Sequence, residues 1–247
     1  MSAQKLLNWW YELPKIWQLF LYHHQKDYTF VVEDLDKYDK EFAEITPQLL
    51  QEIANIARLP VVFKEGTLLL QDIDLTPLTK LKNLADLLLM NAQLRDLSPI
   101  ANMKRLRTLI LSGPDEWAWN PEPPYFPFEF NRGNLQALEK HPRLSYFHIY
   151  GNPGFLDVDL DLISQLPQLR ALTLANTELS KIVSLKPLAN AKHLSYLDIS
   201  NTSVDTLEDI WQLSSLRTLF VSKRFNRLEL HNYRQAHRRC VVKYSAY

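Results

Sequence analysis

LRALTLANTEL (Leu169–Leu179), LSYLDISNTSV (Leu194–Val204) and LRTLFVSKRF (Leu216–Phe225) repeat one pattern, L-x-x-L-x-L. In the first two stretches an Asn follows the last apolar position by two residues. Because side chains alternate between the two faces of a strand, the last two apolar positions of each stretch point to the same face. One such unit cannot bury its leucines alone, so the sequence predicts that the units stack and share a core.

Counting the first leucine of each unit predicts seven units. These leucines are Leu59, Leu84, Leu106, Leu144, Leu169, Leu194 and Leu216, at successive separations of 25, 22, 38, 25, 25 and 22 residues. Each unit is expected to hold a short strand, for instance Leu87 to Met90. Between the strands apolar residues recur every three positions, as at Leu97, Ile100 and Met103, which predicts tight helical turns or extended coil.

This pattern is the sequence signature of a leucine-rich repeat. The predicted fold class is therefore an α/β leucine-rich-repeat solenoid, with a parallel concave sheet, an irregular or helical convex side, a helical N-terminal cap and a helix-strand C-terminal cap. The repeats from Leu59 to Phe225 resemble bacterial leucine-rich repeats of the internalin-like type, including the phrases DLSPIANMKRL and KPLANAKHL between strands. The resemblance implies protein binding through the concave sheet, and it implies no particular reaction.

Three parts of the chain follow from this pattern. Residues 1–58 are predicted to form a helical N-terminal cap, residues 59–225 the repeats, and residues 226–247 a C-terminal cap of a helix and a strand. The apolar spacing in residues 2–25 predicts an amphipathic helix broken near Leu13, and a membrane-surface helix is the alternative interpretation. Thr46 and Pro47 predict the start of a further helix that runs to about Arg58.

The 38-residue unit holds an insertion rich in proline and aromatic residues, PDEWAWNPEPPYFPFEFNRG, at positions 114–133. Proline at this density prevents regular helix or sheet, so a shaped loop is expected. Its aromatic residues are expected either to pack back on the solenoid or to anchor a partner, and both interpretations stay open. The residues in question are Trp117, Trp119, Tyr125, Phe126, Phe128 and Phe130.

Side chains at the third, fifth and seventh positions of each unit are predicted to line the concave sheet. Few of them are charged, and many are tyrosines or small polar residues, a composition that favours a protein or peptide over nucleic acid. The predicted partner-binding residues on this surface are Tyr146, His148, Tyr150, Tyr196, Asp198 and Phe220. Asn91, Asn176 and Asn201, next to these positions, are expected to support the turn after the strand.

Chemistry is not expected from these residues. His148 and Asp198 lie two repeats apart, roughly 10 Å, which is too far for a direct pair of catalytic base and orienting carboxylate. Asp157, Asp159 and Asp161 resemble the start of a calcium loop but lack the Gly and the closing Glu, and should lie on the convex surface. The sequence therefore predicts no catalytic residue, no metal site and no cofactor, and a non-enzymatic interaction module of undetermined oligomeric state.

Lys plus Arg and Asp plus Glu number 28 each, so no overall charge draws the chain to nucleic acid or to an anionic membrane. An alternative function is nevertheless binding to one of these through the predicted C-terminal helix, where Arg224, Arg227, His231, Arg234 and Arg238 share one face. The single cysteine, Cys240, excludes an internal disulfide. Neither a signal peptide nor a run of about 18 apolar residues is visible, so the expected location is the cytoplasm.

Overall fold

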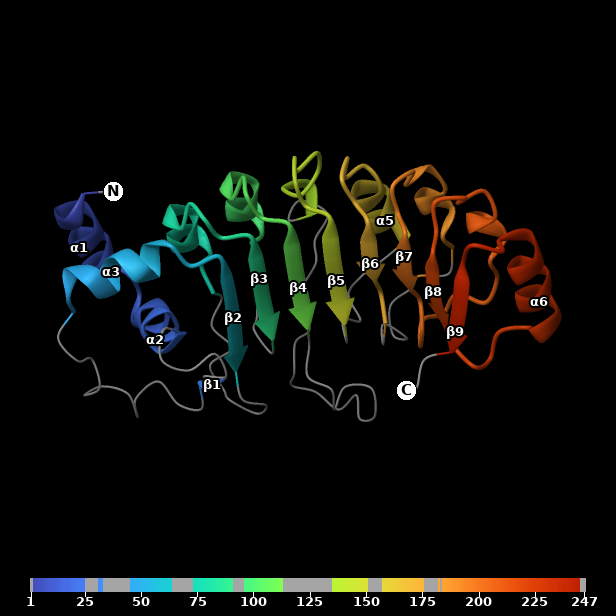
Figure 1. Cartoon of the computed structure of the whole chain (residues 1–247), viewed down its shortest axis with the longest axis horizontal. Helices are drawn as coiled ribbons and strands as arrows, with labels where there is room; N and C mark the ends of the chain where they lie inside the picture. The colour runs from blue at the N-terminus through green and yellow to red at the C-terminus, as the bar shows by residue number, and fades with distance from the viewer. Residues whose placement is uncertain are drawn as a thin grey trace.

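The computed structural model describes residues 2–24, 31–32, 45–63, 73–90, 96–112, 135–150, 157–175, 182 and 184–244. Their strands lie side by side along the long axis of the molecule, as Figure 1 shows, with α1, α2 and α3 at one end and α6 at the other. The helical turns that connect the strands lie together along one border of the sheet. The chain therefore advances by one strand and one return segment at a time.

Within the described residues, nine parallel strands form one sheet, and their spatial order is their order in the sequence. They are β1 (Val31–Val32), β2 (Arg58–Phe63), β3 (Asp86–Met90), β4 (Thr108–Ser112), β5 (Tyr146–Tyr150), β6 (Ala171–Thr173), β7 (Tyr196–Asp198), β8 (Thr218–Val221) and β9 (Val241–Tyr244). The strand predicted at Leu87 to Met90 is confirmed as β3. The 38-residue unit keeps the register of its neighbours, because Leu109 of β4 lies opposite Phe147 of β5.

The described return segments are short helical turns or helices, which confirms the prediction from the three-residue apolar period. Four of them are 3₁₀ helices of three to five residues, and another is an α-helix of eight residues. They are η2 (Thr76–Lys80), η3 (Ser98–Asn102), η5 (Lys186–Asn190), η6 (Glu208–Ile210) and α5 (Asp157–Ser164). Leu160 and Ile163 of α5 are fully buried, as predicted, whereas Asp161 is exposed on the outside of the turn.

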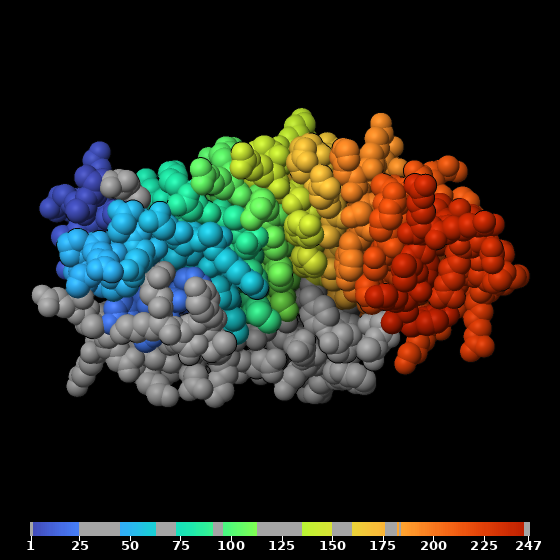
Figure 2. Space-filling model, in the orientation of Figure 1, coloured from blue at the N-terminus to red at the C-terminus, as the bar shows by residue number. Residues whose placement is uncertain are grey.

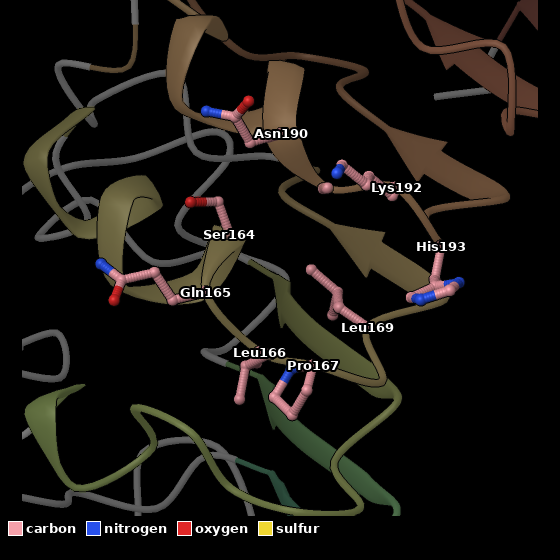
Figure 3. A pocket seen from close by; sticks show the side chains of 9 residues that line it. Ser164, Gln165, Leu166, Pro167, Leu169, Asn190, Lys192 and His193 are labelled. Carbon is pink, nitrogen blue, oxygen red and sulfur yellow. The ribbon is translucent and has the colours of Figure 1, made fainter.

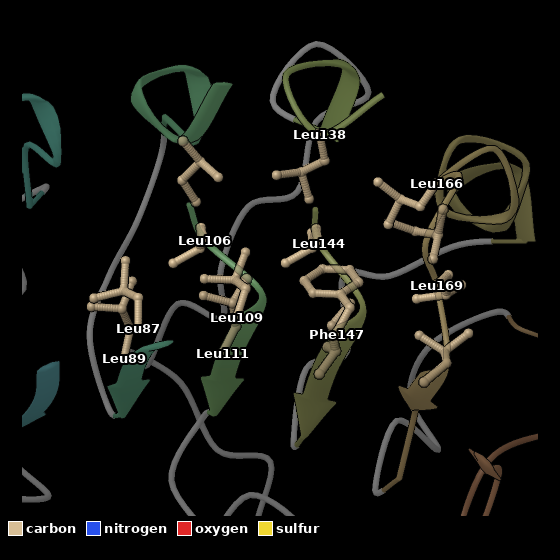
Figure 4. Packing of buried hydrophobic residues seen from close by; sticks show 14 of the residues in the cluster. Leu87, Leu89, Leu106, Leu109, Leu111, Leu138, Leu144, Phe147, Leu166 and Leu169 are labelled. Carbon is tan, nitrogen blue, oxygen red and sulfur yellow. The ribbon is translucent and has the colours of Figure 1, made fainter. Parts of the chain in front are cut away.

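The core lies between the sheet and these turns. Figure 4 shows the first, fourth and sixth residues of neighbouring repeats stacked in rows, with Leu138 reaching down from the turn above Leu144. Leu109, Leu111, Leu144 and Phe147 have no exposed surface. Each row continues into the next repeat, so the buried leucines form one continuous hydrophobic cluster along the solenoid.

The structure corrects the start of the first repeat. Leu59 was expected to be a first-position leucine, but it pairs with Leu87, the fourth position of the next unit. The first position is therefore Ile56, which is buried and lies 28 residues before Leu84. The prediction was wrong because the apolar residues of α3 continue without a break into those of β2. The sequence pattern alone does not show whether Ile56 or Leu59 is the first position of the repeat.

The helices described before the repeats are α1 (Ala3–Glu12), α2 (Lys15–His24) and α3 (Pro47–Ala54). The break between α1 and α2 lies at Leu13 and Pro14, as predicted. Residues 1–58, predicted as a helical N-terminal cap, also contribute β1 and the first residue of β2. Helix α3 ends at Ala54 rather than near Arg58, because Asn55 caps it and the chain then enters β2.

The apolar faces of these helices are buried in the protein itself. Trp10 and Trp17 are almost fully buried, and the Trp17 indole Nε1 donates a 2.7 Å hydrogen bond to the Asp74 carbonyl oxygen. In α3, Leu50 and Ile53 are buried against the same cluster. These side chains are engaged within the fold, which supports the interpretation of a cap over that of a membrane-surface helix.

At the other end, helix α6 (Arg227–Ala236) is followed by β9, which pairs with β8. Its buried Tyr233 stacks on His237 with ring centroids 4.2 Å apart, and Trp211 of the last repeat meets both rings edge-on. Arg234 of α6 donates a 3.1 Å hydrogen bond from Nη2 to the Val242 carbonyl oxygen of β9. The helix is thus attached both to the last repeat and to the last strand.

Candidate protein-binding face

Two rows of side chains cross the face of the sheet that points away from the buried leucines. The third-position row is Arg58, Asp86, Thr108, Tyr146, Ala171, Tyr196, Thr218 and Val241, and the fifth-position row is Pro60, Leu88, Ile110, His148, Thr173, Asp198, Phe220 and Lys243. We call these sixteen positions the open face. The one-to-one register holds each side chain about 4.8 Å from its row neighbours.

His148, Thr173 and Asp198 are consecutive members of the fifth-position row. The His148 Nδ1 and the Thr173 Oγ1 are 2.8 Å apart and share a hydrogen bond. Asp198 lies one strand further on, so Thr173 separates the imidazole from the carboxylate, in agreement with the predicted two-strand distance. Asp198 Oδ1 accepts hydrogen bonds from the backbone N–H and the hydroxyl of Ser200.

Burial is the main influence on the His148 imidazole and lowers its pKa, while the negative charge of Asp198 raises the pKa by a smaller amount. The net pKa lies below the ordinary value of 6.5, so His148 is neutral at pH 7. This row does not resemble a catalytic triad, in which the histidine stands between hydroxyl and carboxylate. Here the hydroxyl of Thr173 is in the middle, and this residue is only 9% exposed.

Three aromatic residues lie on the open face between β5 and β8, and two of them, Tyr196 and Phe220, adjoin Asp198. Tyr146 is 44% exposed, and the rings of Tyr196 and Phe220 are in contact with centroids 5.6 Å apart. Lys243 lies over the Phe220 ring, with Nζ 5.6 Å from the centroid, in a cation-π contact. Burial, followed by the charge of Asp198, raises the pKa of Tyr196, so this side chain remains a phenol.

The structure corrects the extent of the predicted surface. Of the seventh-position side chains expected on it, Met90 is 37% exposed as predicted, whereas Ser112, Ala175, Ser200 and Ser222 are at most 7% exposed. Strands β6 and β7 end at the fifth position, so the alternation of side chains stops before Ala175 and Ser200. Ala171 and Thr173 of β6 are also buried, because side chains this small lie below their larger neighbours.

The turn after β7 explains the role of Asn201. Its φ of 51° lies in the left-handed region, which Asn tolerates better than most residues, and its backbone N–H donates a 2.7 Å hydrogen bond to the Ser222 Oγ. The prediction that Asn201 supports the turn is thus confirmed. Asn91 and Asn176 lie outside the described residues.

Sequence reasoning missed two features of the open face. Thr173 was counted in the fifth column, but its hydrogen bond to His148 was not foreseen. Lys243 was assigned to a terminal strand and not aligned with the columns. It lies 23 residues after Phe220, close to one repeat length, and extending the fifth column by one unit would have found it.

Several predicted site residues are not tested by the structure. Trp117, Trp119, Tyr125, Phe126 and Phe128 of the insertion lie outside the described residues. Tyr150 is the last residue of β5, but its side chain also lies outside them. Their roles stay predictions.

All adjacent strands are parallel and in register, and the first, fourth and sixth positions of successive units stack in a continuous core. This chain is a leucine-rich-repeat solenoid. No family model and no curated protein matches its sequence. The solenoid is similar to internalin C2 from Listeria monocytogenes, with 22% identity, a TM-score of 0.48, and coverage of 78% of this chain and 72% of the other.

A second internalin of Listeria monocytogenes, inlF, is 20% identical, with a TM-score of 0.47 and coverage of 81% of this chain and 57% of the other. A leucine-rich-repeat protein of Leptospira interrogans is 22% identical, with a TM-score of 0.45 and coverage of 82% and 58%. The solenoid thus spans less than two thirds of these two proteins.

The C-terminal end of the solenoid is strongly basic. Residues 217–244 hold eight Lys or Arg and one acidic residue, Glu229, so this end carries a charge of +7 and the rest of the neutral chain −7. Glu229 is itself engaged, because its Oε1 accepts a 2.6 Å hydrogen bond from the Leu207 N–H and a 3.0 Å bond from the Thr206 hydroxyl. All eight basic side chains are exposed, at the end of the molecule drawn red in Figure 2.

A shallow hollow of about 250 Å³ lies between α5 and η5, at the border of the sheet that holds the helical turns (Figure 3). It is lined by Ser164, Gln165, Leu166, Pro167, Leu169, Asn190, Ala191, Lys192 and His193. None of the predicted site residues belongs to it. The hollow is the space between two successive return segments, and it is separate from the open face.

Other sites are not evident in the described part of the chain. No group of three His, Cys, Asp or Glu residues there could hold a metal ion. Cys240 is buried, and burial raises the pKa of its thiol to about 11, which suppresses the reactive thiolate. None of the described helices has the length and apolar character needed to span a bilayer.

Proposed function

We propose that this solenoid is a non-enzymatic module that binds a protein partner on the open face, around Tyr146, His148, Tyr196, Asp198 and Phe220. The observation that carries the proposal is the composition of this surface between β4 and β8. It combines an exposed tyrosine, an aromatic pair and a single carboxylate. Tyrosine is enriched in the energetically important centres of protein interfaces, and charged residues are depleted there.

The rigidity of the surface supports the same function. Each open-face side chain from β2 to β8 stands on a strand that is hydrogen-bonded on both sides, so a partner meets a preformed arrangement and little ordering entropy is lost on binding. The insertion at 114–133 follows β4 directly in the sequence, and we propose that its aromatic residues add to the interface.

The test is capture of partners from the lysate of the native host, followed by affinity measurement with the purified partner. Replacing Tyr146 and Tyr196 by Ala is expected to weaken binding by about 30-fold or more, since two hot-spot tyrosines contribute at least about 2 kcal/mol. Tyr11→Ala is the matched control, because Tyr11 is 70% exposed on α1, away from the sheet. Equal affinity of the double variant and the control would place the binding site elsewhere.

A second variant tests the insertion. Residues 114–132 are replaced by a short Gly-Ser linker, and circular dichroism confirms that the product folds. A partner captured only by the intact protein would make the insertion part of the interface. Equal capture would leave the open face as the sole proposed site.

The charge of +7 on residues 217–244 favours a second candidate function, binding of a polyanion at the basic end. Arg234 is a poor probe of this function because it also holds β9. Exchanging Arg227 and Arg238 for Ala is expected to weaken binding of a labelled 20-base-pair DNA and to reduce its salt dependence, whereas exposed Lys5→Ala should change neither. Salt-insensitive binding, or none, would remove this candidate.

We further propose that the protein works in the cytoplasm of a bacterium. The single cysteine, Cys240, cannot form an internal disulfide, which suits a reducing compartment. The resemblance of the repeats to a bacterial type supports the source. Fractionation of host cells with an antibody to the protein would test the location.

A further inference from the structure

We propose that the open face recognises a cationic side chain of its partner, arginine foremost, held against the Tyr196 ring with its charge at Asp198. This inference rests on the proposed function and names the chemistry of the partner. It follows from the charge, hydrogen bonding and aromatic surroundings of one carboxylate.

Asp198 is the one acidic or basic side chain, apart from the neutral His148, among the described open-face positions of β4 to β8. Its Oδ1 is occupied by the two hydrogen bonds from Ser200. Within the described part of the chain, Oδ2 accepts no hydrogen bond and Asp198 forms no ion pair. One carboxylate oxygen thus remains available to a donor that arrives from outside.

The rings around Asp198 favour a cation over a neutral group. Tyr196 stands two residues earlier on the same strand and face, and Phe220 is the next member of the row. The negative faces of such rings attract ammonium and guanidinium groups. The chain already shows this attraction, because Lys243 places its Nζ 5.6 Å from the centre of the Phe220 ring.

Lys243 forms no ion pair with Asp198 in the described part of the chain. Phe220 stands between the two residues in the row, and the Lys243 Nζ lies over the ring of Phe220. The neutral imidazole of His148 adds no positive charge on the other side. The negative potential at Asp198 is therefore left for the partner.

Arginine suits this surface better than lysine does. Its flat guanidinium can stack on a tyrosine ring and at the same time direct N–H donors toward a carboxylate in its own plane. Lysine offers a point charge without a planar surface. An acidic side chain would instead meet Asp198 with like charge.

The test is an NMR titration of the full-length, ¹⁵N-labelled protein with two peptides. They are acetyl-Gly-Ser-Arg-Ser-Gly-amide and the same peptide with citrulline, which has nearly the shape of arginine but no charge. The arginine peptide is expected to shift amide signals of β5, β6 and β7, with a dissociation constant on the order of 1 mM for one isolated side chain. The citrulline peptide is expected to bind at least about tenfold more weakly.

Two matched variants separate the local effect of Asp198 from that of net charge. Asp198→Asn should reduce arginine binding to the level of citrulline, while Asp205→Asn removes the same charge from an exposed position after β7 and should leave binding unchanged. Lys243→Met should strengthen binding roughly twofold, because a positive charge near the site is removed.

Equal binding of the two peptides, no binding of either, shifts located away from β5 to β7, or equal behaviour of the two aspartate variants would each overturn the inference. The proposed function is judged separately, by the tyrosine double variant and the captured partner. A partner that depends on Tyr146 and Tyr196 but binds Asp198→Asn normally would leave the protein-binding function standing and reject the cationic recognition.

Discussion

Replacing His141 should destabilise the solenoid and alter its response to acid. His141 occupies the position three residues before the first leucine of its repeat, where other units have Leu81, Met103 or Leu213. Its ring is 3% exposed; Nδ1 accepts a 3.1 Å hydrogen bond from the Leu144 N–H, and Nε2 lies 3.2 Å from the Met103 carbonyl oxygen. This arrangement requires the neutral tautomer with the proton on Nε2.

In other units a backbone carbonyl is the acceptor for the N–H of the first leucine. Leu106, for example, donates a 2.8 Å hydrogen bond to the carbonyl oxygen of Met103, three residues earlier. In the β5 unit the imidazole substitutes for that carbonyl, next to Lys140, whose φ is 60°. His141→Ala removes the acceptor from the buried Leu144 N–H and leaves a cavity.

An unsatisfied buried donor costs about 1–3 kcal/mol, and the lost ring packing adds to this, so we expect a total loss of about 2–4 kcal/mol for His141→Ala. His141→Leu restores apolar volume but not the acceptor, and should lose about 1–3 kcal/mol. Urea unfolding at pH 7.5, followed by circular dichroism, measures both. A loss below about 0.5 kcal/mol for the Ala variant would refute the role given to the ring.

The pH dependence follows from the same ring. Burial, the largest influence, lowers the pKa of His141; the Met103 carbonyl opposes this shift and the charge of Lys104 adds to it. The folded pKa is thus below the ordinary 6.5, so on acidification the unfolded chain binds a proton first. The contribution of His141 to the free energy of unfolding is therefore fully present above pH 6.5. It falls between pH 6.5 and the folded pKa and changes no further below that pKa.

When the unfolded chain binds one more proton than the folded chain, the free energy of unfolding falls by at most about 1.4 kcal/mol per pH unit. Burial lowers the pKa values of His24 and His148 as well, so the wild type should lose stability on acidification with several contributions of the same sign. Between pH 6.5 and 5, the free energy of unfolding of His141→Leu should fall less per pH unit than that of the wild type. Parallel curves for the two proteins would contradict the assignment.

Three further measurements test other parts of the fold. Phe147→Ala should cost about 3–5 kcal/mol in urea unfolding, because the ring is fully buried between two repeats, and a cost below about 1 kcal/mol would argue against the observed packing. Thr46→Ala should cost about 1 kcal/mol, because its hydroxyl oxygen accepts a 3.1 Å bond from the Leu49 N–H at the start of α3, whereas Thr46→Ser should be nearly neutral. Cys240, buried and with a thiol pKa of about 11, should react with Ellman's reagent at least about 100-fold faster in urea than in the native protein, and equal rates would show an accessible thiol.

The sequence predicted most of the sheet because one physical rule fixes it. Leucines at the first, fourth and sixth positions must be buried, and a one-residue shift of register would turn them outward. Residues as far apart as Leu109 and Phe147 therefore align in spite of the long insertion between them. The rule failed at Leu59, where apolar residues of α3 and β2 run together.

Other features depend on distances that no linear pattern contains. The burial of Ser200 and Ser222 depends on where β7 and β8 end and on the turn after β7, where the Asn201 N–H donates a hydrogen bond to the Ser222 hydroxyl. Strand β1 is two residues long and gave no period to detect. The tyrosines of the open face could be predicted from their positions in the repeats. The hydrogen bond between His148 and Thr173 could not, because it depends on the rotamers of both side chains.

The two ends of this solenoid differ from its middle in what they permit over evolutionary time. Any internal unit meets its neighbours through the same register, so duplication or deletion of a whole repeat preserves every contact type on both sides. At the C-terminal end, the Arg234 side chain of α6 donates a hydrogen bond to the Val242 carbonyl oxygen of the last strand. In a longer solenoid this oxygen would accept a backbone N–H from the next repeat. The solenoid can therefore lengthen by duplication of internal repeats, whereas extension beyond β9 would first require the loss of α6.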